Sequence, residues 1–189
     1  MATTATAPKF QPVNTDGSYG ETGFWSWMTT VDHKRIGTLY LYTALFFFIV
    51  GGIEAGIMRW QLALPNSHVV SAQIYNQLFT MHGTTMVFLA IMPLSAAFFN
   101  YLIPLQIGAR DVAFPRLNAF SYWVYLLGGL FISIPILFKT APAAGWFGYA
   151  PLTPPHSPRR LNIAFLVIGL RPLAISSLSA PCHSSTTPS

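Results

Sequence analysis

Residues 60–109 contain no Asp, Glu, Lys or Arg. Over the whole chain of 189 residues, 52% are hydrophobic and only 8% are charged. A soluble domain usually carries roughly 25% charged residues, which coat its water-facing surface. The chain is therefore predicted to fold in a lipid bilayer, as an all-α, polytopic bundle of transmembrane helices.

Apolar segments long enough to cross a bilayer occur three times. A spanning helix needs about 20 predominantly apolar residues, and the predicted spans cover residues 36–58, 77–103 and 117–138. The second span contains Pro93, which we expect to kink it, because proline removes a backbone hydrogen bond.

The positions of the basic residues predict how the spans are oriented. If the helices alternate in direction, the side that holds the N-terminus carries Lys34, Arg35, Arg110 and Arg116, and the other side carries Arg59 and Lys139. Cytoplasmic loops hold the excess of Lys and Arg, so the N-terminus is predicted to be cytoplasmic.

Both ends of the chain differ from the predicted spans. Residues 1–28 are polar and rich in Thr, Pro and Gly, which predicts a disordered tail. A fourth apolar stretch begins at Leu161, but Arg171-Pro172 interrupts it after too few residues to span a bilayer. We therefore interpret residues 154–189 as a degraded fourth helix with a Ser/Thr/Pro-rich end, for which truncation or a shifted reading frame is our hypothesis.

Composition excludes two kinds of site. The single cysteine, Cys182, rules out a disulfide framework and a cysteine-based metal site. No run of basic residues is longer than two, so nucleic acid is not an expected partner. The expected surroundings are the lipid bilayer.

One imidazole lies inside an uncharged span. His82 stands in the second predicted span, a turn or two from its outer end. Such a residue usually faces a partner, a water cavity or a metal, because a polar group is expensive to leave in hydrocarbon. Imidazole is a common ligand of haem iron. The alternative is a structural hydrogen bond between helices.

Several neighbours of His82 are candidates for the same site. Gly83 leaves room for a flat ligand and Met86 lies one turn later on the same face, although both are also typical of plain packing. Arg59 ends the first span at a depth predicted to be similar to that of His82, where it either contacts a shared cofactor or anchors the helix at the interface. Glu54, the only acid within a span, is expected to pair with Arg59 or to bind a polar ligand.

A second group of polar residues lies at the cytoplasmic end of the predicted spans. Asp111 is in the loop between the second and third spans, and Asn100 and Asn118 are at matching depth near the ends of those spans. A carboxylate at the mouth of an internal path can collect protons, and amides can hold a chain of waters. The alternatives are a solvated acid paired with Arg110 or Arg116, and amides that cap or join helices.

Three stretches resemble a known family. They are residues 30–40 (TVDHKRIGTLY), 74–83 (IYNQLFTMHG) and 100–118 (NYLIPLQIGARDVAFPRLN), with a weaker fourth at 145–152. Together they resemble the N-terminal part of subunit I of the haem–copper oxidases, specifically the cytochrome c oxidases, over residues 28–153 and faintly over 161–178. The pattern Asp-x-Ala-Phe-Pro-Arg-x-Asn at residues 111–118 is its most specific part.

The resemblance implies a haem site. His82 resembles an axial ligand of the low-spin haem, and Arg59 resembles the arginine that hydrogen-bonds the formyl group of that haem, which implies a haem of the A type. Met86 resembles a haem-packing residue, and Trp146 is similar to a tryptophan near the haem propionates. The second haem and the copper ion have their ligands outside this chain, in the full-length protein only.

The resemblance also implies a proton path. Asp111 resembles the entrance of a proton channel, with Asn100 and Asn118 as the amides just inside it. The implied protein is the catalytic subunit of a proton-pumping respiratory oxidoreductase, in a bacterial plasma membrane or an internal energy-transducing membrane. Its implied partners are the other oxidase subunits and cytochrome c, the electron donor to oxygen.

Two alternative functions stay open, and one departure is visible. The quinol-oxidising branch of the superfamily tends to carry an Arg, an acid and a His where this chain has Val50, Glu54 and Ile74; only the acid is present, which favours cytochrome c. A non-catalytic protein that only packs helices would bind no pigment. The chain departs from the family at Gln61, where a carboxylate usually contributes to an outer cation site, which puts that site in question.

Overall fold

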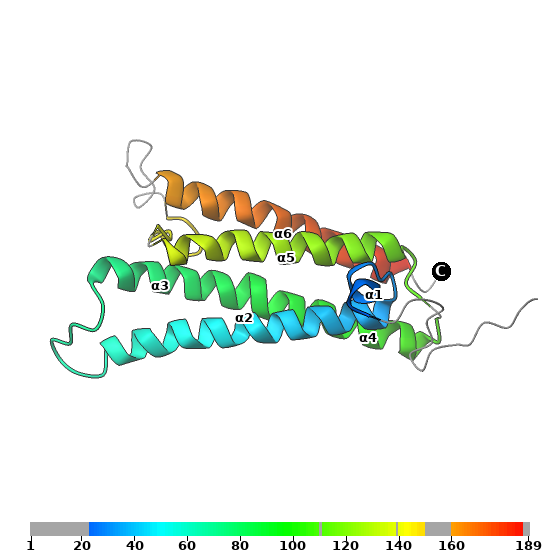
Figure 1. Ribbon diagram of the computed structural model, residues 1–189, viewed down its shortest axis with the longest axis horizontal. Coiled ribbons are helices and arrows are strands. Elements are labelled where there is room, and N and C mark those ends of the chain that lie inside the picture. Colours follow the sequence, from blue (N-terminus) through cyan, green and yellow to red (C-terminus); the bar gives the residue numbers. More distant parts are fainter. Residues whose placement is uncertain (1–22, 110, 139, 150–159, 187–189) are drawn as a thin grey trace, which may run out of the picture. The chain divides into compact units, whose positions relative to one another are not determined.

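The computed structural model describes residues 23–109, 111–138, 140–149 and 160–186, and these contain helices, turns and loops but no strand (Figure 1). The chain divides into two units, residues 1–30 and residues 31–189. Within the described residues of the second unit, three helices are long and apolar enough to cross a membrane. The predicted all-α transmembrane fold is confirmed.

The smaller unit contains one short helix, α1 (Phe24–Met28). Its last turn closes where the N–H and the hydroxyl of Thr29 both donate to the carbonyl of Trp25. These residues fall within the tail predicted to be disordered, so that prediction is wrong for α1. The rest of the predicted tail, residues 1–22, lies outside the described residues.

The first predicted span is α2 (His33–Gln61). Asp32 caps it, because its carboxylate accepts a hydrogen bond from the Lys34 N–H at 3.0 Å and so satisfies a free donor at the helix N-terminus. Buried positions recur every three or four residues from Ile36 to Met58. The helix thus turns one face to the bundle and leaves large apolar side chains exposed on the other, as a helix between protein and lipid requires.

The second predicted span is one continuous helical stretch with a change of pitch. It consists of α3 (Ala72–Thr84), the π-helix η1 (Thr85–Ile91) and α4 (Met92–Ile107). Ser71 caps its start by accepting a hydrogen bond from the Ile74 N–H, and Gly108, at φ 71°, ends it.

The π-helix lies where the sequence predicts a kink at Pro93. In a regular α-helix the Leu89 carbonyl accepts from the N–H of residue 93, and proline has none. The hydroxyl of Tyr125, from the third span, donates to this carbonyl at 2.9 Å. The neighbouring helix therefore satisfies the backbone group that Pro93 leaves without its usual donor.

The third and fourth predicted helices pack against each other as α5 (Pro115–Leu137) and α6 (Arg160–Thr186). Gly169 permits the close approach, since a Cβ there would overlap with Cγ1 of Ile132. The helix α6 runs through Arg171 and Pro172 without a break, so the predicted interruption is a change of composition and not of backbone structure. Residues 163–177 of α6 form a shorter apolar stretch, and the interpretation of residues 154–189 as a degraded fourth helix stays a prediction.

Four helical stretches lie side by side in the larger unit (Figure 1). The first, α2, packs against α3, η1 and α4 and also touches α5, which in turn packs on α6. The core lies between them and contains Ile36, Tyr40, Phe47, Met81, Leu89, Ala97, Tyr122, Tyr125, Ile132, Ala141 and Leu173. This packing fixes the relative positions of the polar residues on facing helices.

Candidate functional site

His82 is tied to the neighbouring helix through one ring nitrogen. Its Nδ1 lies 2.9 Å from the carbonyl oxygen of Gly51 in α2. Since a carbonyl only accepts, Nδ1 donates, and in the neutral ring the lone pair then lies on Nε2. Among the described residues this is the only hydrogen bond of the ring. The tautomer is the one that a metal-binding imidazole adopts when a carbonyl orients it.

Met86 packs on the same point of α2. A Cβ on Gly51 would lie 2.7 Å from the Met86 sulfur, so the glycine allows η1 to approach α2 at this level. Met86 and His82 are both half-buried. The side chains of His82 and Met86, predicted to lie on one face, thus both contact α2 at Gly51.

Trp146 is brought to Gly83, the residue after His82, by a loop distant in sequence. The Gly145 N–H donates to Thr80 Oγ1 at 3.0 Å, and Gly145 adopts φ +74°, a backbone conformation that favours glycine. The indole of Trp146 then lies against Gly83, whose Cβ would be 3.3 Å from Trp146 Cδ1. The indole thus occupies the space beside Gly83, which agrees with the alternative of plain packing that the sequence left open.

Arg59 does not lie at the depth of His82. The ring of His82 is level with Gly51, and Arg59 follows Gly51 by eight residues, which is about 12 Å along the helix axis. The prediction that Arg59 and His82 lie at similar depth is therefore wrong. Arg59 is exposed and makes no ion pair within the described part of the chain, so a ligand that contacts both residues has to extend along α2.

Glu54 is a buried acid one turn from Gly51 on α2. It is 4% exposed, and the predicted ion pair with Arg59 is absent from the described residues. The hydroxyl of Thr85 in η1 lies beside the carboxyl group, but neither oxygen makes a hydrogen bond of ordinary geometry there. A buried carboxyl group without a partner is costly, so Glu54 is suited to a polar ligand or a water.

Asp111 has a partner that the sequence analysis did not predict. Its Oδ1 accepts a hydrogen bond from the Val112 N–H at 2.8 Å and lies 3.1 Å from Nδ1 of His33, at the start of α2. The predicted pairing with Arg116 is wrong, since Arg116 is exposed and makes no such bond. The other predicted partner, Arg110, lies outside the described residues.

The two predicted amides are buried at the same end of the larger unit. Asn100 is 3% exposed and Asn118 is fully buried. Both polar atoms of the Asn118 amide lack a hydrogen-bond partner among the described side chains and backbone. An amide left in this state is a place where ordered water is expected, because buried polar groups are almost always satisfied.

Hydroxyl groups continue inward from Asn118. Ser121 donates to the Asn118 carbonyl at 2.7 Å, and its hydroxyl oxygen lies 3.0 Å from the hydroxyl of Tyr40. Ser176, on α6, is 3.3 Å from the same Tyr40 hydroxyl and donates to the Ser121 carbonyl at 2.8 Å. Three helices thus contribute to one buried hydroxyl cluster.

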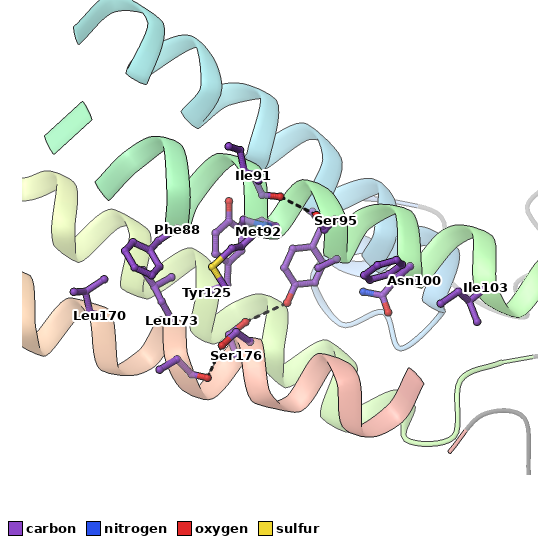
Figure 2. A pocket seen from close by; sticks show the side chains of 16 residues that line it. Phe88, Ile91, Met92, Ser95, Asn100, Ile103, Tyr125, Leu170, Leu173 and Ser176 are labelled. Carbon is purple, nitrogen blue, oxygen red and sulfur yellow. Dashed lines mark hydrogen bonds between the residues drawn. The ribbon is translucent and has the colours of Figure 1, made fainter. Parts of the chain in front are cut away.

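A pocket of about 720 Å³ adjoins this hydroxyl cluster. Its walls are mainly apolar, and its polar lining includes Tyr40, Asn100 and Ser176. Figure 2 shows Asn100, Tyr125 and Ser176 meeting at the pocket from α4, α5 and α6. The pocket is large enough for several waters beside these polar groups.

Four polar residues of this region were not predicted from the sequence: His33, Tyr40, Ser121 and Ser176. A signal was available for His33, which follows the helix-capping Asp32 inside the stretch that carries the resemblance. Tyr40 and Ser121 look like ordinary helix residues in the sequence. Ser176 lies in the part interpreted as degraded, yet it is buried and bonded to α5.

Comparison with known proteins identifies the family. The family model described as "Cytochrome C and Quinol oxidase polypeptide I" matches residues 35–182. The chain belongs to this family. The match includes every predicted site residue and most of α6, so the family model covers with one match the part of the chain where the resemblance is clear, up to residue 153, and the part where it is faint, residues 161–178.

Individual members of the oxidase family agree with this assignment. The chain is 51% identical to "Cytochrome c oxidase subunit 1" of Bacillus subtilis over 156 residues, 82% of this chain and 25% of the relative. It is 53% identical to "Putative cytochrome c oxidase subunit 1-beta" of Streptomyces avermitilis over 127 residues, 67% of this chain and 23% of the relative. It is 40% identical to "Quinol oxidase subunit 1" of Bacillus spizizenii over 155 residues, 82% of this chain and 24% of the relative. The chain thus spans about a quarter of the length of these relatives.

Proposed function

We propose that this chain forms the N-terminal portion of the catalytic subunit of a proton-pumping terminal oxidase that passes electrons from cytochrome c to oxygen. Its own contributions are a low-spin haem ligand and the entrance of a proton path. The oxygen-reducing centre, with the second haem and copper, belongs to the remainder of the subunit. The other oxidase subunits are its further partners.

One observation carries the haem assignment. The Gly51 carbonyl holds His82 with Nδ1 as donor, which leaves the Nε2 lone pair free within a membrane-spanning helix. The residues present therefore fit a haem, which when bound would supply one-electron transfer. His82 would ligate the iron through Nε2, Met86 would pack against the ring, and Trp146 would cover the neighbouring side.

Arg59 has the remaining role in this haem site. It lies about 12 Å from the level of His82, so it would reach a substituent at the edge of the macrocycle and not the ring centre. A hydrogen bond to a formyl group there would withdraw electron density and raise the haem potential. This is the argument for a haem of the A type.

The proton path begins at Asp111. Its carboxyl group is 38% exposed, and the His33 ring bonded to it is 2% exposed, so the pair joins water to the interior. Asn118 and Asn100 would hold waters behind the pair, and the hydroxyls of Tyr40 and Ser121 would carry the chain of hydrogen bonds onward. A proton pump must collect its protons on the cytoplasmic side, which agrees with the orientation predicted from loop charge.

Cytochrome c is the proposed electron donor. The relatives that are 51% and 53% identical are named as cytochrome c oxidases, whereas the one named as a quinol oxidase is 40% identical. Of the three side chains typical of quinol-oxidising members, only the acid, Glu54, is present. Donor assays on the intact complex test this: oxidation of quinol but not of cytochrome c would reverse the choice.

The experiment for the haem assignment is an optical spectrum of membranes that contain the full-length subunit. His82→Ala is expected to abolish the low-spin haem absorbance, because no other described side chain in this region offers the iron a lone pair in the same position. His68→Ala is the matched control, since His68 is exposed in the loop between α2 and α3. Unchanged low-spin absorbance in His82→Ala would refute the assignment.

A further inference from the structure

The loop between α2 and α3, residues 62–71, is fastened to the end of α2 by one side chain. The amide of Gln61 donates through Nε2 to the carbonyl of Ser67, and its Oε1 accepts from the N–H of Val70 at 2.9 Å. Both bonds are partly buried. The bonded residues lie six and nine positions further along the chain, so the amide closes the loop across most of its length.

Only an amide can make this pair of bonds. Nε2 is a donor and Oε1 an acceptor, so a primary amide can serve a carbonyl and an N–H at once. A carboxylate of the same length would still accept from Val70, but its second oxygen would face the Ser67 carbonyl and repel it. A cation between the two oxygens could relieve that repulsion, because Ca²⁺ is bound by carboxylate and backbone carbonyl oxygens.

The surroundings of Gln61 do not fit a cation. The sequence has no Asp or Glu at residues 55–110, so the loop and both flanking helix ends lack negative side chains. Arg59 adds a positive charge two residues before Gln61. No group of three His, Cys, Asp or Glu side chains that could hold a metal ion occurs in the described part of the chain. The cation site that family resemblance suggests at this position therefore does not fit the residues present.

We propose that Gln61 is a metal-independent clamp, whose amide nitrogen takes the place of a cation and holds residues 62–71 against the end of α2. The clamp fixes the connection from α2 to Ser71, the residue that caps α3. Gln61 is thus a positioning residue: it holds the connection between α2 and α3, the helix that carries His82. The inference needs only the hydrogen bonds of Gln61 and does not depend on haem binding.

Hydrogen–deuterium exchange tests the clamp. The full chain is placed in lipid nanodiscs, and the exchange rate of the Val70 amide is measured once with calcium and once with a chelator. In the unsubstituted chain neither calcium nor chelator is expected to change exchange. Gln61→Ala is expected to speed exchange at Val70 about fivefold, the factor that one side-chain hydrogen bond of ordinary strength supplies. Gln73→Ala, an exposed glutamine in the first turn of α3, is the control and should change nothing.

Gln61→Glu separates the clamp from a general structural effect. It keeps the size of the side chain and the acceptor for Val70, so it remains a test if Gln61→Ala does not fold. We expect Gln61→Glu to raise the exchange of the loop to the same extent with calcium and with a chelator, because its second oxygen repels the Ser67 carbonyl and residues 55–110 hold no other negative side chain. A chelator effect on the unsubstituted chain, equal exchange in Gln61→Ala and Gln73→Ala, or a Gln61→Glu variant whose loop exchanges as slowly as that of the unsubstituted chain would each overturn the proposal.

Discussion

The Nδ1 atom of His33 lies 3.1 Å from the Oδ1 atom of Asp111, although 78 positions separate the two residues. The imidazole is 2% exposed and the carboxyl group is 38% exposed, so the acid faces water and the ring lies behind it. The second ring nitrogen of His33, Nε2, is buried and has no hydrogen-bond partner among the described residues. Since imidazole can take a proton at one nitrogen and release one at the other, the pair has the geometry of a relay.

Removal of the acid in this pair should slow proton uptake. In the intact oxidase, Asp111→Asn keeps the shape of the side chain but cannot bind and release a proton, and we expect turnover to fall by up to roughly 10²-fold. His33→Asn, which can still donate to Asp111, should have a smaller effect in the same direction. Oxygen consumption and proton release by reconstituted vesicles measure both. Normal turnover and pumping in Asp111→Asn would remove Asp111 from the path.

Asn118 offers a test in which stability and activity should move in opposite directions. Its amide is fully buried and neither polar atom has a described partner. Asn118→Leu should stabilise the fold by about 1 kcal/mol, because an apolar side chain of similar size replaces a buried amide together with the water expected to satisfy it. The same change should slow proton-coupled turnover, since leucine cannot hold a water. Thermal unfolding and oxygen consumption are the two measurements. A loss of stability would contradict the prediction and would mean that leucine cannot replace the amide and its water without loss to the fold.

Tyr125 should matter through a single hydrogen bond. Tyr125→Phe leaves the Leu89 carbonyl without the donor that replaces the N–H missing at Pro93, and we expect a loss of about 1–2 kcal/mol in the free energy of unfolding. Tyr42→Phe is the matched control, because Tyr42 is 68% exposed and should be neutral. Unfolding in detergent micelles compares the two. Equal stability of both variants would show that the π-helix satisfies Leu89 by itself.

The periodic and compositional features of the chain were predictable from sequence. The three spans follow from uncharged apolar length. The helix α2 and the α3–α4 stretch extend beyond the predicted residues at both ends, because helices continue past the hydrocarbon until a cap ends them, whereas α5 starts two residues early and ends at Leu137, one residue before the predicted end. Asp32 and Gly108 are such ends, and both residue types favour those positions. The predicted interruption at Arg171 does not appear in the backbone, because α6 is packed along α5 and tertiary contacts override a locally unfavourable composition.

The parts of the site that depend on how far one helix is shifted along its neighbour were not predictable from the sequence. His82 was recognised as an unusual imidazole, but its level relative to α2 is set by the Gly51 carbonyl, which has no side-chain signature. The pairing of His33 with Asp111 depends on where α2 starts beside the loop that precedes α5, and no spacing rule relates residues so far apart in the chain. Trp146 reaches Gly83 through a loop whose course depends on the Gly145 bond to Thr80.

Two glycines in different helices should respond oppositely to the same substitution. Gly169→Ala places a methyl group against Ile132 of α5, which is 1% exposed and has no room to move, and overpacking of this kind costs about 1–3 kcal/mol. Gly56→Ala, in α2, meets nothing within 4 Å and should be neutral or stabilising by up to about 1 kcal/mol, because alanine favours the helix. Combining Gly169→Ala with Ile132→Ala should cost less than the sum of the two single changes, since the second removes the atoms that the first displaces. Thermal unfolding of the three single variants and the double variant in one detergent tests these expectations. Additive losses in the double variant would show that α5 and α6 are not packed through Gly169 and Ile132.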